Sequence, residues 1–93
     1  MFSWDTRKAI INFGKHGVSF EEAATIFADT EGLNWEDSVH SAQETRYKRV
    51  GMSVGGNILI TVYTVRRTKD GKETIRIISA RRASRKERKA YLG

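Results

Sequence analysis

The spacing of apolar residues in the first third of the chain predicts two short helices. Asp5 is a suitable N-cap for a helix over residues 6–16, and Gly17 suits a left-handed stop after it. Ser19 followed by Glu22 is the sequence pattern of a capping box, which predicts that a second helix begins there. This helix carries four apolar residues at the spacing i, i+3, i+4, i+7, which is typical of one buried stripe: Phe20, Ala23, Ala24 and Phe27.

The middle of the chain changes to the alternating pattern that predicts strands. Three segments are expected as antiparallel strands: Arg46–Val54, Ile58–Val65 and Thr74–Ala80. Two shorter segments, Phe2–Trp4 and Leu33–Asp37, have the composition of short strands. Ile58–Val65 is apolar on both faces, which favours a central place in the sheet. Alternation puts Arg46 and Lys48 on the same side of their strand.

Turn and capping signals complete the outline. Gly55-Gly56-Asn57 and Asp70-Gly71 predict two hairpin turns, and Ser84 with Glu87 predicts a capped last helix that runs to about Tyr91. The order of elements predicts one α+β domain over residues 1–93. We expect two N-terminal helices, a three- to four-stranded antiparallel sheet and a C-terminal helix, with helices on one face of the sheet.

The distribution of charge adds an expected partner. The formal net charge is +6, but residues 19–45 contain seven acids and no Lys or Arg. Residues 64–93 contain eleven Lys and Arg and only three acids. Such a concentration of bases in one part of a small chain is typical of a protein that binds a polyanion.

Composition excludes several classes of protein. The chain has no cysteine, so disulfides and thiolate metal sites are excluded. The N-terminus has no basic stretch followed by an apolar run, and Ile58–Val65, the longest apolar stretch, is too short to span a bilayer. We therefore expect a cytoplasmic protein that does not contact a membrane.

Several short stretches occur in an order that is specific for a chain of this size. They are Trp4-Asp5; Lys8 with Asn12; Lys15-His16-Gly17-Val18 with Phe20; Arg46 with Gly51; Val62-Tyr63-Thr64 with Arg66; Ile75-Arg76-Ile77-Ile78-Ser79-Ala80-Arg81; and Glu87-Arg88 with Tyr91. In this pattern the chain resembles the BrnT toxins from Phe2 to Tyr91.

The resemblance implies a fold related to that of the RelE and ParE toxins, and a ribonuclease activity that arrests growth. It also implies neutralisation by a BrnA-type antitoxin that carries a ribbon-helix-helix DNA-binding region. Operator DNA would then be bound only through the toxin–antitoxin complex. The loop over residues 67–73 is longer than expected for the family, which affects where Arg66 lies.

RNA cleavage by internal transesterification requires a base for the 2′-hydroxyl, an acid for the leaving oxygen and positive charge around the phosphate. The nucleophile is part of the substrate, so neither a metal nor another cofactor is required. The sequence has no pair of histidines at ligand spacing, and its acids do not cluster with His16 or His40. We expect a reaction without a metal or cofactor.

Arg81 is the first candidate for the catalytic site. A strand pattern places Ile75, Ile77, Ser79 and Arg81 on one face, so a guanidinium would end an apolar row and hold a phosphate. Arg76 would point to the opposite face, and the alternative role for Arg81 is a structural ion pair with Glu36 or Glu44. Arg66 would converge with Arg81 across neighbouring strands, and Arg85 lies in the first turn of the last helix, where anions bind.

The other candidates each have a structural alternative. His16 can act as base or acid, and Lys15 can bind phosphate, yet both residues end a helix, where basic side chains also interact with free carbonyls. Four further residues are candidates for RNA binding: Lys8, Tyr63, Arg88 and Tyr91. Tyrosines in strands and helices commonly serve packing instead. Capping alone accounts for Glu87.

Two other functions are compatible with the same composition. A basic helix beside a sheet is also suited to a nucleic-acid-binding module without catalysis. A ParE-style toxin would instead act by binding another protein. For the toxin, we expect the antitoxin to cover part of the basic C-terminal surface, because shielding the arginines would block RNA, and to associate more slowly as ionic strength rises.

Overall fold

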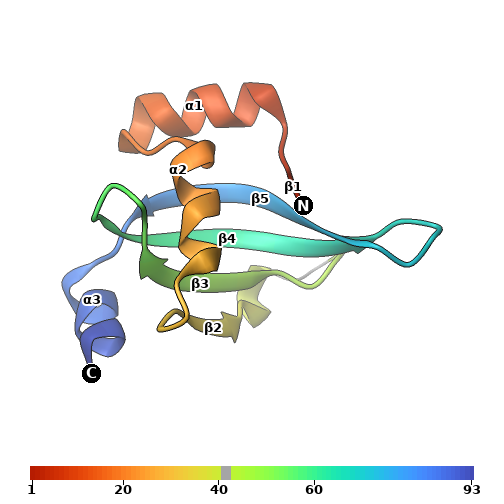
Figure 1. Ribbon diagram of the computed structural model, residues 1–93. Coiled ribbons are helices and arrows are strands. Elements are labelled where there is room, and N and C mark those ends of the chain that lie inside the picture. Colours follow the sequence, from red (N-terminus) through yellow and green to blue (C-terminus); the bar gives the residue numbers. More distant parts are fainter. Residues whose placement is uncertain (41–42) are drawn as a thin grey trace.

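The computed structural model describes residues 1–40 and 43–93, which form one five-stranded sheet with helices around it (Figure 1). The elements in chain order are β1 (Phe2–Ser3), α1 (Thr6–His16), α2 (Phe20–Thr25), the 3-10 turn η1 (Ile26–Ala28), β2 (Leu33–Glu36), the 3-10 turn η2 (Ser38–His40), β3 (Tyr47–Met52), β4 (Ile58–Arg67), β5 (Glu73–Arg82) and α3 (Arg85–Leu92). The strands lie in the order β1-β5-β4-β3-β2, so β4 is central, as its apolar sequence predicts. None of the helices in this described part is long and apolar enough to cross a membrane.

The α+β class is confirmed, but the prediction of a three- to four-stranded antiparallel sheet is wrong. Both short segments join the sheet as edge strands, and β1 pairs in parallel with β5, with Phe2 opposite Ile75. β2 pairs antiparallel with β3, with Leu33 opposite Val50. The direction of β1 depends on a partner some seventy residues later in the chain, which local alternation does not encode.

The helix caps form where the sequence places them, with one change of partner. Asp5 accepts a hydrogen bond from the Lys8 N–H at 3.0 Å, and Gly17 ends α1 with φ 69°. Ser19 likewise caps α2 by accepting from the Glu22 N–H at 3.0 Å. The Glu22 carboxylate does not return to this cap. It accepts hydrogen bonds from two side chains of the β3–β4 turn, Ser53 Oγ at 2.6 Å and Asn57 Nδ2 at 2.8 Å. Glu22 therefore fastens α2 to the sheet.

The core lies between one face of the sheet and the two N-terminal helices, of which α2 crosses that face in Figure 1. Its buried residues come from both layers: Val18, Phe20, Ala23, Ile26, Leu59, Ile77 and Ala80. Asn12, only 7% exposed, joins α1 to β5. Its side chain donates to the carbonyls of Ala80 at 2.8 Å and Val18 at 3.1 Å, and accepts from the Ala80 N–H at 3.1 Å. We call this side of the sheet the helix face and the opposite side the open face.

A β-bulge in β5 changes which residues share a face. Val62 lies opposite Ser79 but Tyr63 lies opposite Ile77, so Ile78 is an extra residue. Ile77 and Ala80 are both buried under the helices, whereas Ser79 and Arg81 are on the open face. The prediction that Ile75, Ile77, Ser79 and Arg81 share one face is therefore wrong. Arg76, flanked by Ile75 and Ile77, lies on the open face with Arg81 instead of opposite to it.

The last helix lies beside the end of the sheet (Figure 1). It begins with the predicted capping box of Ser84 and Glu87, in which each side chain bonds to the other residue's backbone N–H. Tyr91 fixes its other end, because the Tyr91 hydroxyl donates to Asp29 Oδ2 at 2.5 Å. The same carboxylate oxygen accepts from the Met52 N–H at 2.8 Å, so α3 is attached to β3 through Asp29.

Candidate functional site

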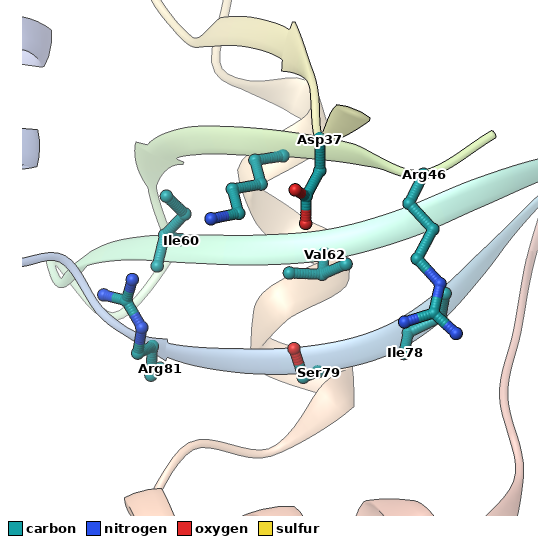
Figure 2. A pocket seen from close by; sticks show the side chains of 8 residues that line it. Asp37, Arg46, Ile60, Val62, Ile78, Ser79 and Arg81 are labelled. Atoms are coloured by element: carbon teal, nitrogen blue, oxygen red, sulfur yellow. The ribbon is translucent and has the colours of Figure 1, made fainter. Parts of the chain in front are cut away.

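The open face contains a hollow of about 230 Å³ near its centre (Figure 2). Three adjacent strands and the segment after β2 contribute its lining residues: Asp37, Arg46, Lys48, Ile60, Val62, Ile78, Ser79 and Arg81. Apolar side chains from β4 and β5 form the floor, and the polar groups stand around it. The hollow therefore combines three cationic side chains, one carboxylate and one hydroxyl.

Figure 2 shows how these groups are arranged. Arg81 and Arg46 lie at opposite ends of the hollow, with the Asp37 carboxylate and the Ser79 hydroxyl between them. Asp37 is 8% exposed, and its N–H donates to the Arg46 carbonyl at 2.8 Å, which extends the pairing of β2 with β3 by one step. Lys48 lies opposite Val62 on the neighbouring strand. A group bound in the hollow would be enclosed by positive charge at both ends and would have a carboxylate beside it.

Arg81 is held by an acid that the sequence interpretation assigned to capping alone. Its Nη1 and Nη2 donate to the two oxygens of the Glu87 carboxylate at 2.8 and 2.9 Å. This bidentate hydrogen bonding lowers the pKa of Glu87 to about 2 and raises that of Arg81. The acids expected as alternative partners, Glu36 and Glu44, lie elsewhere, and Glu44 pairs with Arg66. Arg81 thus contributes to the hollow while its guanidinium is positioned from α3.

The cationic side chains continue along the open face beyond the hollow. Alternation along β4 puts Arg66 on this face, and Arg76 lies there opposite Thr64. Arg66 does not converge with Arg81, because Arg81 lies opposite Ile60, six residues and about 20 Å from Arg66 along β4. The expected convergence is wrong for this reason. The basic row is the set of open-face cations: Arg46, Lys48, Arg66, Arg76 and Arg81.

The structure separates the α1 candidates from the hollow. Lys15 and His16 are exposed residues in the last turn of α1, and Lys8 is exposed in its first half. This helix packs on the helix face, where Asn12 bonds to the backbone of Ala80. These three candidates therefore lie on the other side of the sheet from Arg81.

The two tyrosine candidates are engaged in packing. Tyr63 is 7% exposed and faces the helices, where its ring stacks on Tyr47 and meets the edge of Phe27. Its hydroxyl donates to Asn34 Oδ1 at 3.0 Å, and burial raises its pKa. The hydrogen bond from Tyr91 to Asp29 likewise raises the pKa of Tyr91. The Tyr63 ring is therefore buried in packing, and the Tyr91 hydroxyl is engaged within the fold.

The candidates of the last helix lie on a separate surface. Arg85 and Arg88 are exposed and border a shallow depression of about 440 Å³ together with Lys89 and Leu92. Arg88 also lines a polar hollow of about 290 Å³ with Arg82 beside the β3–β4 turn. Of the five residues predicted for catalysis, Arg81 alone lines the hollow on the open face.

Three charged residues of the hollow were not among the predicted site residues: Asp37, Arg46 and Lys48. A signal for the two cations was present, because alternation puts Arg46 and Lys48 on one side of a strand next to the apolar central strand. Asp37 carries no such signal, since it follows a short edge strand in an acidic region. Within the described residues, no three His, Cys, Asp or Glu side chains gather as metal ligands.

Comparisons with known proteins identify the family. No curated protein matches the chain. Among solved structures, the crystal structure of the Brucella abortus ribonuclease toxin BrnT matches with a TM-score of 0.66 and 24% sequence identity. The match covers 91% of this chain and 99% of the Brucella chain, so the two proteins share the fold. Residues 4–87 match the sequence family described as the ribonuclease toxin BrnT of type II toxin–antitoxin systems. The hollow and its basic row are therefore features of a chain that belongs to the BrnT family of ribonuclease toxins.

Proposed function

We propose that this chain cleaves RNA by metal-independent transesterification in the hollow of the open face. The observation that supports this site is the gathering of Arg46, Lys48 and Arg81 around one carboxylate, Asp37. Cleavage of RNA by its own 2′-hydroxyl requires positive charge around the phosphate and groups that move two protons, and the hollow supplies both kinds of group.

Each polar group of the hollow has a role in this proposal. Asp37 takes the proton of the 2′-hydroxyl, whose oxygen then attacks the phosphorus. Lys48 gives a proton to the 5′-oxygen as its bond to phosphorus breaks, which leaves a 2′,3′-cyclic phosphate and a 5′-hydroxyl end. Arg46 and Arg81 stabilise the charge that develops on the phosphate oxygens. The sequence-based candidates Lys15 and His16 are not part of this centre.

The basic row provides a path for the rest of the substrate. Arg76 and Arg66 lie on the same face as Arg81, along the direction of β4. Consecutive phosphates of a single strand would meet these cations, while the apolar floor of the hollow contacts a base or ribose. This arrangement favours single-stranded RNA as the substrate.

The partner in this proposal is a BrnA-type antitoxin. Its ribbon-helix-helix region would bring the toxin to operator DNA, so the toxin itself would contact DNA only through the complex. The sequence match to a type II toxin–antitoxin family supports a protein antitoxin. The basic row is the surface that such an antitoxin must shield in the cytoplasm to prevent cleavage. A relation of the fold to that of RelE is also part of the proposal.

The experiment is cleavage of a defined single-stranded RNA by purified protein in EDTA, with analysis of the product ends. We expect 2′,3′-cyclic phosphate ends, and a loss of about 100-fold or more in rate for Asp37→Asn and Lys48→Gln. His16→Gln is the comparison, and we expect it to retain the rate. Circular dichroism verifies that each variant is folded.

The alternatives predict different results. A centre at the end of α1 would make His16→Gln inactive and leave Asp37→Asn active. A binding module without catalysis would leave the RNA intact but bound, with a graded loss of affinity as cations are removed one by one. A toxin that acts on another protein would neither bind nor cleave the RNA.

A further inference from the structure

The outer surface of α1 exposes more apolar side chain than its place in the fold requires. Ile10, Ile11 and Phe13 are 68%, 61% and 56% exposed. They do not contribute to the core, which α1 meets through Ala9 and Asn12. Ile10 and Phe13 also border a hollow of about 320 Å³ between α1 and the start of α2, with these lining residues: Trp4, Thr6, Ala9, Ile10, Phe13, Ser19, Phe20 and Glu21. We call the exposed side chains of Ile10, Ile11 and Phe13, together with this hollow, the apolar face of α1. It is separate from the open face of the sheet.

Gly14 lies within this face, and it independently indicates that another chain binds there. Gly14 lies in the interior of α1, where glycine disfavours a helix by about 1 kcal/mol relative to alanine. Its φ is not positive, and a Cβ built on Gly14 would meet nothing within 4 Å, so the isolated fold does not require glycine here. Gly14 follows Ile10 by four residues and Ile11 by three, so it leaves a notch beside both side chains. A notch of this kind allows another chain to approach the helix closely.

The charges around the apolar face of α1 indicate which kind of partner chain would bind there. Arg7, Lys8 and Lys15 flank the exposed apolar residues, and α1 itself contains no acid. Asp5, at the end of the helix, is engaged by the Lys8 N–H, and Glu21 stands at the far side of the hollow. Two copies of this surface would bring like charges together, which disfavours a symmetric dimer through α1.

We propose that the apolar face of α1 is the docking surface for an amphipathic helix of the antitoxin. That helix would place apolar side chains on Ile10 and Phe13, and acidic side chains toward Arg7, Lys8 and Lys15. The proposal rests on the proposed function only for the existence of an antitoxin, because the docking surface does not include the hollow. The antitoxin is thus anchored on one side of the sheet and shields the basic row on the other.

The charged edge and the apolar centre of this interface should affect different rate constants of binding. Charge pairs at its edge govern the association rate, which falls as salt is added. Buried apolar contacts govern the dissociation rate, which salt changes little. The complex should therefore associate more slowly at high ionic strength and dissociate at nearly the same rate.

The first test replaces one apolar side chain of the face by an acid. Ile10→Asp should weaken binding of the purified cognate antitoxin at least 10-fold, mainly through faster dissociation in biolayer interferometry. Val54→Asp is the matched control, because Val54 is 84% exposed on the β3–β4 turn and is not part of the apolar face of α1. Both variants should cleave RNA at the rate of the unmodified protein, which separates this inference from the proposed catalytic site.

The second test uses Gly14. Gly14→Ala and Gly14→Gln should raise the thermal midpoint of the free protein, because both residues favour a helix and a Cβ at this position meets nothing within 4 Å. The same two variants should weaken antitoxin binding, and glutamine should do so more than alanine because it fills the notch. A merely structural role for this position would not combine greater stability with weaker binding.

Three results would overturn the inference. One is unchanged antitoxin affinity in both Ile10→Asp and Gly14→Gln. Another is a dimer of the free protein, measured by analytical ultracentrifugation, that Ile10→Asp dissociates, since a second copy would then be the occupant. The third is binding to vesicles with anionic lipids that Ile10→Asp abolishes while antitoxin binding persists.

Discussion

The guanidinium of Arg81 and the carboxylate of Glu87 form two parallel hydrogen bonds, 2.8 and 2.9 Å long, that join the end of β5 to α3. The Glu87 carboxylate also accepts the N–H of Ser84 at 2.7 Å, so one acid caps the helix and fixes the arginine. The Glu87 side chain is 18% exposed and that of Arg81 is 40% exposed. The position of a residue in the proposed catalytic hollow therefore depends on the attachment of the last helix.

The first prediction concerns the stability of this connection. Glu87→Gln should lower the free energy of unfolding by about 1 kcal/mol at pH 7, a value that allows for screening of the exposed arginine. The pKa of Glu87 is about 2 in the folded protein, below its ordinary value of 4.5. The stabilisation is therefore complete above about pH 4.5 and is lost as the pH falls toward 2. Urea titrations of both proteins at pH 7, 5 and 3 measure this, and the two curves should approach each other at pH 3.

The second prediction separates catalysis by Arg81 from attachment of α3. Arg81→Ala should reduce RNA cleavage by about 100-fold or more, because it removes a donor that stabilises charge on the phosphate. Glu87→Gln should change the rate less than about threefold, because the glutamine amide oxygen can still accept one hydrogen bond from Arg81 and keep the guanidinium beside the hollow. Single-turnover cleavage rates at pH 7 compare the two variants. Equal losses would instead show that Arg81 acts by holding the last helix in place.

The third prediction concerns the basic row. Arg66 and Arg67 are neighbours on β4, and each pairs with one acid, at 3.3 Å to Glu44 and 3.1 Å to Glu73. Alternation puts Arg66 alone on the open face. Arg66→Gln should weaken binding of single-stranded RNA and reduce the slope of log K against log salt by about 0.7, the value for one phosphate.

Arg67→Gln is the control for this measurement, since it removes the same charge from the other face of the same strand. Its slope should equal that of the unmodified protein. Fluorescence anisotropy with a labelled oligonucleotide, at several salt concentrations and with an inactive variant as background, provides the data. Equal changes in both variants would indicate a response to net charge without a defined path for the strand.

Local signals in the sequence predict the parts of the fold that local physical chemistry determines. Caps and stops at Asp5, Gly17 and Ser84 are side-chain and backbone effects within one turn of a helix, and the structure confirms them. The central place of β4 follows from its two apolar faces. These features depend on residues that are close together in the sequence, so local sequence patterns are sufficient to predict them.

The features that the sequence interpretation missed depend on pairing between distant segments. The bulge at Ile78 has no glycine or other marker, and it arises from the register between β4 and β5. One extra residue moves Ser79 and Arg81 away from the face of Ile77, which is why the face predicted for Arg81 was wrong. The pair of Arg81 with Glu87 was missed because capping already accounts for a glutamate at that position.

The last prediction compares two buried threonines of β4, of which one has a hydrogen-bond partner for its hydroxyl among the described residues and the other has none. Thr61 and Thr64 are 0% and 1% exposed. Thr64 Oγ1 donates to the Thr45 carbonyl at 2.9 Å, whereas no described residue forms a hydrogen bond with Thr61 Oγ1. Replacement by valine keeps the shape of the side chain and removes only its hydroxyl. Thr61→Val should therefore raise the free energy of unfolding by about 1 kcal/mol, because a buried hydroxyl without a partner is destabilising.

Thr64→Val should have the opposite sign and lower the free energy of unfolding by about 1 kcal/mol, because it leaves the Thr45 carbonyl without its donor. Urea denaturation of the two variants, followed by circular dichroism, gives both values in the same strand and at nearly equal burial. The Thr64 side chain points to the open face and that of Thr61 to the helix face, so the pair also tests how β4 is oriented in the sheet. If both variants were destabilised equally, Thr61 Oγ1 would have a hydrogen-bond partner in solution, and the surroundings of Thr61 would differ from those in the structure.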